Sequence, residues 1–212
     1  MNANTPHPNK RALLVIDVQN EYFTGNLRVS YPPVEQTLPN ICRAMDAAHA
    51  AHIPIVLVQH VASSGAPIFA PGSEGVALHP DIAGRPHDLL VQKSMASALT
   101  GTTLAAWLKA HEIEVLTIVG YMTHNCNDAT ARQASHEGWR VELLHDASAS
   151  LPYSNAVGSA SAEEIHRVFS VVMHTGFAAV ASTDEWLAAL AKGEVLAPDN
   201  VYSSNQRALA SC

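Results

Sequence analysis

The sequence predicts an α/β domain in which helices cover both faces of a parallel sheet. Its 212 residues suit one domain of ordinary size, large enough to bury a sizeable core. Short runs of Val, Leu and Ile recur along the chain without polar alternation, which is typical of strands buried on both faces. Amphipathic segments with helical spacing lie between these runs. This alternation of strand and helix predicts a doubly wound sheet.

The predicted strands are six apolar runs, and the predicted helices are the segments between them. The strands span residues 12–16, 53–60, 88–92, 115–120, 140–144 and 177–182. The first helix follows Pro32 and Pro33, because proline is favoured at the start of a helix. The helices span residues 34–48, 104–108, 124–137, 161–174 and 184–191. Two histidines of the fourth helix, His166 and His174, are expected to face solvent or a subunit contact.

The segments outside this alternation divide the chain. Residues 61–87 are rich in Gly, Pro and Ser and too irregular for a crossover helix. Because a loop of this length in a compact domain is usually functional, we expect it to wall a ligand site. Residues 1–10 are predicted to be a flexible tail, residues 11–192 the domain and residues 193–212 a C-terminal arm.

Charge and composition restrict the partners of the protein. The net charge is −7 and no basic cluster exists to neutralise phosphates, so we expect a small-molecule substrate and no nucleic-acid partner. No apolar run approaches the roughly 20 residues that span a bilayer, and the first ten residues lack a signal-peptide core, so we expect no membrane partner and a cytoplasmic protein. Three widely spaced cysteines, Cys42, Cys126 and Cys212, fit a reducing compartment.

Three chemically useful residues fall at or just beyond the ends of predicted strands. Asp17 follows ALLVI, Lys93 follows DLLVQ, and Cys126 lies shortly after VLTIVG. Because the carboxyl ends of parallel strands converge on one crevice, these residues could meet there. Each also has a structural interpretation: a strand-end cap, a solvated loop lysine and a small buried side chain, respectively.

The position of Cys126 favours nucleophilic chemistry. Thr123 is a plausible N-cap of the helix after Gly120, so Cys126 would lie in its first turn, where the helix and Lys93 would lower the thiol pKa. Asp17 could take the thiol proton, and nearby backbone N–H groups could stabilise an oxyanion. The combination predicts acyl transfer to sulfur followed by hydrolysis.

These segments carry a resemblance to a known family. ALLVIDVQNEYF, VQKSMASAL and VGYMTHNCNDATARQA resemble the three signature segments of the isochorismatase-like cysteine hydrolases, the superfamily that includes nicotinamidases, and the similarity covers about residues 11–191. The resemblance implies a Rossmann-like, three-layer αβα sandwich and a catalytic triad of Asp17, Lys93 and Cys126. It also implies a cis peptide bond between Tyr121 and Met122, with an oxyanion hole formed by the backbone of Met122 and Cys126.

The sequence departs from the nicotinamidase pattern at its metal site. Nicotinamidases carry an Asp-x-His pair after the second strand, where this chain has His60, Val61 and Ala62. We therefore expect no metal and no other cofactor, and nicotinamide is a poor substrate candidate. A dinucleotide-dependent oxidoreductase is disfavoured too, because no G-x-G-x-x-G follows the first strand.

The predicted function is hydrolysis of a C–N bond in a small amide, imide or ureide through a thioester on Cys126. Two alternatives remain open: acid-catalysed hydrolysis of a vinyl ether by Asp17, as in isochorismatases proper, and ligand binding without turnover. Family members usually associate, so we expect a homo-oligomer, a dimer or a tetramer. The candidate substrate-binding residues are Gln19, Phe23, His60, Phe69, Tyr121 and Tyr153.

Overall fold

A six-stranded parallel sheet forms the centre of the protein. The computed structural model describes residues 10–211. The strands lie in the order β3-β2-β1-β4-β5-β8, all parallel, so the order reverses between β1 and β4. Their bounds are β1 Arg11–Ile16, β2 Ile55–His60, β3 Leu89–Lys93, β4 Val115–Tyr121, β5 Arg140–Ala149 and β8 Ala179–Ala181. In a doubly wound sheet the crevice at such a reversal, beyond the carboxyl ends of the strands, is the usual ligand site.

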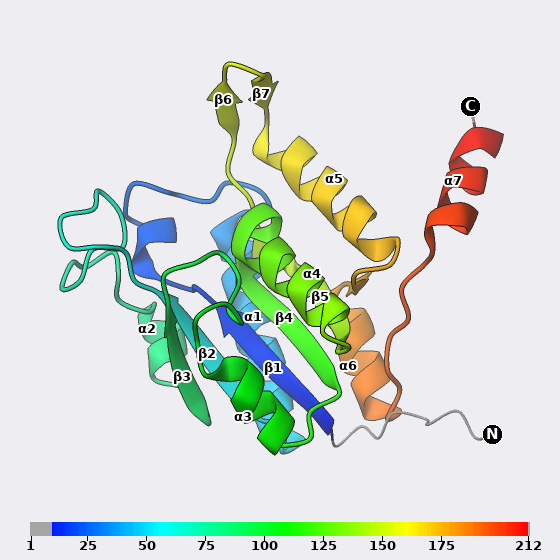
Figure 1. Cartoon of the computed structure of the whole chain (residues 1–212), viewed down its shortest axis with the longest axis horizontal. Coiled ribbons are helices and arrows are strands. Elements are labelled where there is room, and N and C mark those ends of the chain that lie inside the picture. Colours follow the sequence, from blue (N-terminus) through cyan, green and yellow to red (C-terminus); the bar gives the residue numbers. More distant parts are fainter. Residues whose placement is uncertain (1–9, 212) are drawn as a thin grey trace.

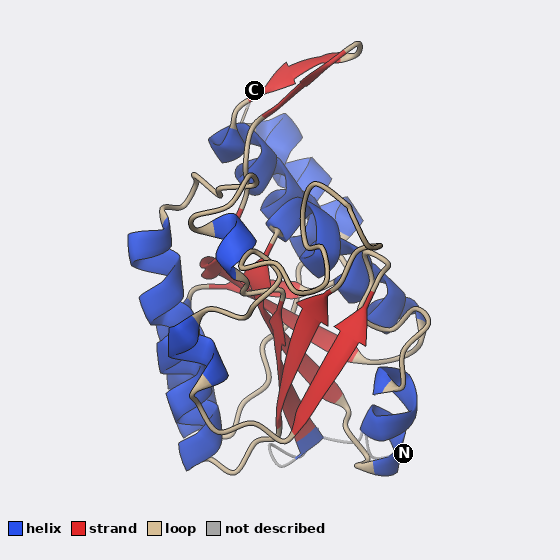
Figure 2. Ribbon diagram, turned by 90° about the vertical axis from the view of Figure 1, so that its left-hand side faces the viewer, coloured by secondary structure: helices blue, strands red, loops and turns tan. Residues whose placement is uncertain are grey.

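Helices cover both faces of this sheet (Figures 1 and 2). One face packs against α1 (Val34–Ala50) and α6 (Thr183–Ala191). The other face packs against α3 (Leu104–Ala110), α4 (Asp128–His136) and α5 (Ala162–His174). The predicted three-layer αβα sandwich is confirmed.

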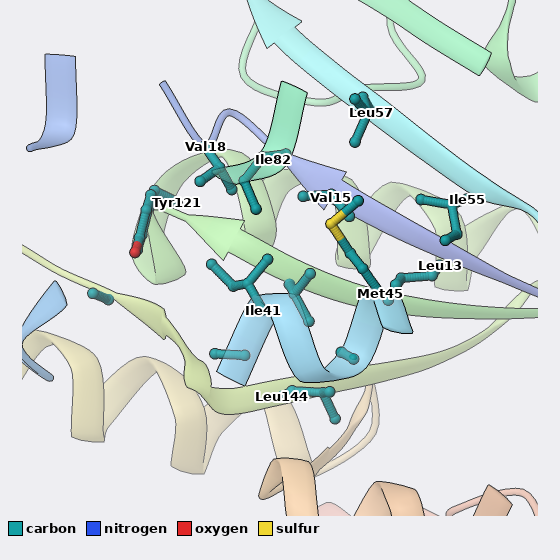
Figure 3. Close-up of a cluster of buried hydrophobic side chains, with 14 of the residues drawn as sticks. Leu13, Val15, Val18, Ile41, Met45, Ile55, Leu57, Ile82, Tyr121 and Leu144 are labelled. Atoms are coloured by element: carbon teal, nitrogen blue, oxygen red, sulfur yellow. The ribbon is translucent and has the colours of Figure 1, made fainter. Parts of the chain in front are cut away.

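Alternate residues of each strand enter opposite halves of the core. Leu13 and Val15 of β1 pack toward α1, whereas Leu14 and Ile16 pack toward α3 and α4. Figure 3 shows the half that faces α1, where Met45 lies between side chains of β1 and β2. Burial on both faces explains why the strands read as continuous apolar runs.

The remaining elements lie mostly at the carboxyl ends of the strands and at the C-terminus. They are a 3₁₀ turn η2 (Asn20–Tyr22), α2 (Pro80–Ala83), a π-helical turn η3 (Thr123–Asn127), the hairpin of β6 (Tyr153–Asn155) with β7 (Gly158–Ala160), and α7 (Val201–Ala210). The hairpin projects from the body beyond α5 (Figure 1). No helix within residues 10–211 is long and apolar enough to cross a membrane.

Two predicted elements differ from the structure. The strand predicted over 140–144 extends to Ala149, because beyond an irregularity in the β4–β5 register Ser148 and Ala149 pair with Gly120 and Tyr121. The helix predicted over 124–137 becomes α-helical only at Asp128, after the π-helical turn. π-Helical turns are rare and occur often at functional sites, and this one contains Cys126.

Candidate active site

Asp17, Lys93 and Cys126 meet in one buried cluster at the carboxyl ends of β1, β3 and β4. Lys93 Nζ lies 2.7 Å from Asp17 Oδ2 and 3.2 Å from Cys126 Sγ. The three residues are only 0%, 4% and 5% exposed, respectively. The structure therefore brings together the three residues that the sequence placed at strand ends.

Lys93 is held at the centre of this cluster by further contacts. Its ammonium group lies 3.2 Å from Nδ1 of His60 and donates a hydrogen bond of 3.1 Å to the carbonyl oxygen of Met95. Among the residues that the structure describes, the Asp17 carboxylate interacts only with the Lys93 ammonium and the Cys126 thiol, and no backbone N–H donates to it. The carboxylate thus retains acceptor capacity for a proton.

The backbone at the ends of β1 and β4 takes conformations that bring the two strand ends together. Asp17 has a φ of 52°, a left-handed conformation that is uncommon for a residue with a side chain. Gly120 has a φ of 107°, and a Cβ atom there would lie 2.1 Å from the carbonyl oxygen of Ile16. Only glycine allows this close approach of β4 to β1. The π-helical turn η3, which carries the candidate nucleophile Cys126 (the nucleophile turn), begins three residues later at Thr123.

The turn that carries Cys126 is anchored at several points. The peptide bond between Tyr121 and Met122 is cis, as the resemblance implied. The N–H groups of Asn125 and Asn127 both donate to the carbonyl oxygen of Met122, at 3.1 and 3.2 Å. Asn127 also donates from its side chain to the carbonyl oxygen of Gly120 at 2.8 Å and to Ser148 Oγ at 3.1 Å. Asn127 therefore ties the turn to β4 and β5.

Thr123 has a different role from the one predicted. Its hydroxyl makes no capping bond but forms a 2.9 Å hydrogen bond with Nδ1 of His166 on α5. His166 is 5% exposed, so it does not face solvent, and the other half of the expectation, a subunit contact, stays a prediction. The reason is tertiary: the inner face of α5 packs on the turn that contains Cys126.

Burial sets the protonation of the cluster. Burial raises the pKa of Asp17, although the neighbouring Lys93 ammonium opposes that shift. Burial alone would lower the pKa of Lys93, but the negative charges of Asp17 and Cys126 outweigh it, and the pKa is raised. Burial, reinforced by the charge of Asp17, raises the pKa of Cys126 despite its hydrogen bond from Lys93. The predicted lowering of the thiol pKa is therefore wrong for the resting site, because Cys126 lies in a buried π-helical turn beside a carboxylate.

Two of the candidate substrate-binding residues are engaged elsewhere. Gln19 is fully buried and its side-chain amide binds only backbone groups: it donates to the carbonyl oxygens of His60 and Val76 and accepts from the His60 N–H. Tyr121 is fully buried in the core and its hydroxyl pairs with Thr37 Oγ1 at 2.8 Å. Both side chains therefore have structural roles in this arrangement.

The other candidates lie closer to the cluster or at its rim. His60 contacts Lys93, and its ring lies 5.3 Å from that of Phe69, centroid to centroid. Phe23 packs against Tyr121 at 5.7 Å. Tyr153 is 43% exposed on the hairpin and packs edge-on against His124 of the nucleophile turn at 5.1 Å.

The irregular segment 61–87 lies against the chain that follows Asp17. The N–H groups of Asn20 and Glu21 donate to the carbonyl oxygens of Ala77 and Gly75, at 2.9 and 3.0 Å. The same segment brings Phe69 next to His60. This placement supports the prediction that the segment walls the site.

Tyr22 is an aromatic residue that the sequence allows in an apolar pocket, although it favours the core. Its ring is 2% exposed and lies 5.3 Å from that of Phe69, centroid to centroid. Burial raises its pKa, and the nearby charges of Cys126 and Asp17 add to the shift. Its position five residues after Asp17 was the available signal, but an aromatic residue in that context reads more often as core.

The donor set does not fit a metal ion. Asp17, His60 and Cys126 each offer one ligand atom, and these atoms lie within 4.8 Å of one another. Lys93 Nζ, however, lies within 3.2 Å of an atom of each of them, so its positive charge occupies the place that a metal cation would need. Val61 and Ala62, which directly follow β2, supply no side-chain ligand atoms.

Comparison with known proteins assigns this site to a family. The family model described as the isochorismatase domain matches residues 11–185, a stretch that contains Asp17, Lys93 and Cys126. The chain belongs to the isochorismatase family. This assignment agrees with the resemblance seen in the three segments that carry the cluster.

Relatives of this isochorismatase-family chain extend over most of its length. The crystal structure of an isochorismatase-like protein from Burkholderia xenovorans has a TM-score of 0.95 and 58% identity, covering 97% of this chain and 99% of that one. The isochorismatase family protein YddQ of Bacillus subtilis is 29% identical over 178 residues, which are 83% of this chain and 98% of YddQ. The ureidoacrylate amidohydrolase RutB of Agrobacterium fabrum is 26% identical over 176 residues, which are 68% of this chain and 77% of RutB.

Proposed function

We propose that this protein is a cysteine hydrolase that cleaves a C–N bond in a small amide, imide or ureide through a thioester on Cys126. The observation that carries the proposal is the buried Lys93 ammonium, which contacts both the Asp17 carboxylate and the Cys126 thiol. The family relationship to an enzyme named as an amidohydrolase supports this class of reaction.

In the proposed first step Asp17 removes the thiol proton as Cys126 Sγ attacks the substrate carbonyl carbon. The thiol pKa is raised in the resting site, so a base must act during the attack, and Asp17, whose Oδ1 is not engaged by Lys93, is our candidate for this base. The C–S bond forms and the carbonyl oxygen becomes an oxyanion. The backbone N–H groups of Met122 and Cys126 are our candidates for stabilising that charge.

In the proposed second step the tetrahedral intermediate collapses to a thioester. The C–N bond breaks and Asp17 returns its proton to the departing nitrogen, which leaves as ammonia or an amine. Water then attacks the thioester carbonyl with Asp17 again acting as base. The C–S bond breaks, the acyl group leaves as an acid, and Asp17 returns the proton to the sulfur, which restores the thiol of Cys126. Lys93 stays charged throughout and stabilises whichever anion, carboxylate or thiolate, is present, because its own pKa is raised.

One observation also favours the alternative in which Asp17 protonates a vinyl ether. Burial raises the pKa of Asp17, and a carboxylic acid with a raised pKa is a better proton donor near neutral pH. This reaction needs no thiol, so substitution of Cys126 separates the two mechanisms.

The deciding experiment is a substrate panel combined with trapping of the intermediate. Amides, ureides, lactams and vinyl ethers are screened for turnover with the wild type, Cys126→Ala and the matched thiol control Cys42→Ala. We expect C–N substrates to be cleaved by the wild type and by Cys42→Ala only, with an acyl adduct on the Cys126 peptide detected by mass spectrometry after acid quenching. Full activity of Cys126→Ala on a vinyl ether would instead support protonation by Asp17, and binding without turnover of any substrate would refute both reactions.

A further inference from the structure

Helix α7 has little contact with the rest of its own chain. It follows the irregular segment 194–200, contains no buried residue, and stands apart from the body in Figure 1. Three of its apolar side chains, Val201, Tyr202 and Leu209, are 70%, 74% and 64% exposed. Because an isolated helix of this length is only marginally stable in water, α7 needs a surface to pack on.

The outer face of α5 carries an apolar surface without a partner. Val168, Val171 and Val172 are 46%, 57% and 42% exposed, and their spacing places them on one side of the helix. The inner side of the same helix is buried, with His166 and Met173 against the body. Both faces of α5 are therefore suited to packing, but only one of them is covered by residues that the structure describes.

A cavity lies between these two helices and continues the apolar face. It has a volume of about 420 Å³ and is bordered by α5, by β8 at the edge of the sheet, and by Ser204 of α7. His166 and Ser170 line it, and each has a buried polar atom, Nε2 and Oγ respectively, without a hydrogen-bond partner within residues 10–211. Buried polar groups are normally paired, so the cavity lacks the group that would complete it.

We propose that the outer face of α5 and this cavity receive helix α7 of a second copy of the chain. Each chain carries both halves of the contact, so a two-fold axis would satisfy the exposed apolar residues of both α7 helices and both α5 helices at once. The incoming α7 presents hydroxyl and amide side chains, Ser203, Asn205 and Gln206, which are of the kind that can pair with His166 and Ser170. Its cation Arg207 is already paired with Asp199, so it does not bring an unpaired charge toward Arg167 of the cavity wall.

This mutual contact, in which each chain receives helix α7 of the other (the α7 exchange), is connected to the active site by one residue. His166 lines the cavity with its Nε2 side and holds Thr123, the first residue of the nucleophile turn, with its Nδ1 side. A helix bound in the cavity therefore packs directly behind the turn that positions Cys126. Association of two copies and the order of the active site are linked by this contact.

Molar mass measured by light scattering after size exclusion tests the exchange. The full chain is compared with a variant that lacks residues 200–212 and with Val171→Asp. The truncation keeps residues 194–196, because Glu194 accepts a hydrogen bond from Arg11 and the Leu196 N–H donates to Glu142. The matched control is Leu90→Asp, which changes an apolar residue of similar exposure, 45%, on β3 at the opposite edge of the sheet.

We expect the wild type and Leu90→Asp to have at least twice the chain mass of 22.6 kDa, and both interface variants to have half the mass of the wild type. Amide hydrogen exchange of residues 201–210 is the second measurement, and it should show protection in the wild type that is lost in Val171→Asp. A monomeric wild type at micromolar concentration would overturn the proposal, as would interface variants of unchanged mass. A monomer that binds a small carboxylate in the cavity would identify the cavity as a ligand site instead.

Discussion

Two ion pairs, each buried beyond 95%, lie at opposite ends of the parallel sheet and differ in how well their carboxylates are bonded. At the amino ends of the strands, Glu142 accepts two hydrogen bonds from Arg11 and others from Thr117, Trp186 and the N–H of Leu196. At the carboxyl ends, Asp17 has, within residues 10–211, its ion pair with Lys93 and the neighbouring Cys126 thiol.

The difference shows how one sheet can place a structural and a reactive carboxylate. Taking a charge out of water is costly unless hydrogen bonds replace the lost solvation. Glu142 receives that replacement and is locked in place, so it contributes to the fold. Asp17 does not, its pKa is raised by burial, and its oxygens remain free to exchange a proton. The carboxylate with fewer hydrogen bonds is the one next to Cys126, the proposed nucleophile.

The largest effect is expected from the reactive pair. Asp17→Asn and Lys93→Ala should each lower kcat by roughly 10³-fold or more, because the members of a triad act as a unit. The double variant should lose no more than the worse single variant, measured on the substrate found in the panel. If the two losses multiplied, Asp17 and Lys93 would act independently and the unit would be disproved.

The structural pair should show the opposite pattern. Arg11→Met leaves Glu142 buried without its cation and should cost about 3–5 kcal/mol of unfolding free energy in urea titrations. The compensated double variant Arg11→Met, Glu142→Leu should recover most of this loss, since no charge is then left buried. Activity per folded molecule should stay at the wild-type level for both variants. A large loss of kcat in a fully folded Arg11→Met would show that the two ends of the sheet are coupled.

A third, smaller effect on stability is expected from His166, which packs behind the nucleophile turn and belongs to neither ion pair. Burial, together with His145 and His124, lowers the pKa of His166 from 6.5 to about 4. The pKa of His166 is lower in the folded protein than in the unfolded chain, so the unfolded chain takes up a proton first as the pH falls. The folded state therefore keeps its full stability above pH 6.5 and loses part of it as the pH falls toward 4. Between pH 7 and 5 the wild type should therefore lose about 2 kcal/mol more stability than His166→Gln. Equal pH dependence of the two proteins in urea titrations would contradict a buried, neutral His166.

The smallest effect is expected from an exposed ion pair. Arg43 and Asp184 join α1 to α6 at 2.5 Å, with side chains that are 48% and 79% exposed. Arg43→Ala should cost less than about 1 kcal/mol, because solvent screens exposed pairs. The same urea titration in low and high salt checks this. A loss as large as that of Arg11→Met would show that burial does not determine how much an ion pair contributes to the free energy of unfolding.

The sequence alone determined the architecture and the three residues of the cluster. Strand and helix periodicity is a local property, so the six main strands were placed to within a few residues except at the end of β5. The topology of parallel sheets, in which strand ends share one edge, allowed Asp17, Lys93 and Cys126 to meet, and the resemblance of three segments to a known family implied that they do. The architecture therefore needed only short-range pattern, whereas the cluster needed the resemblance as well.

Only the tertiary structure decided which polar groups pair and how the thiol is protonated. Gln19 and Tyr121 looked like ligand contacts in the sequence, but β2 and α1 supply partners that engage them. His166 looked exposed on an amphipathic helix and is instead buried against Thr123. The thiol pKa depends on burial by several elements at once, which no local pattern records. Hydrogen-bond partners and desolvation are set by residues distant in the chain, and therefore appear only when the chain is folded.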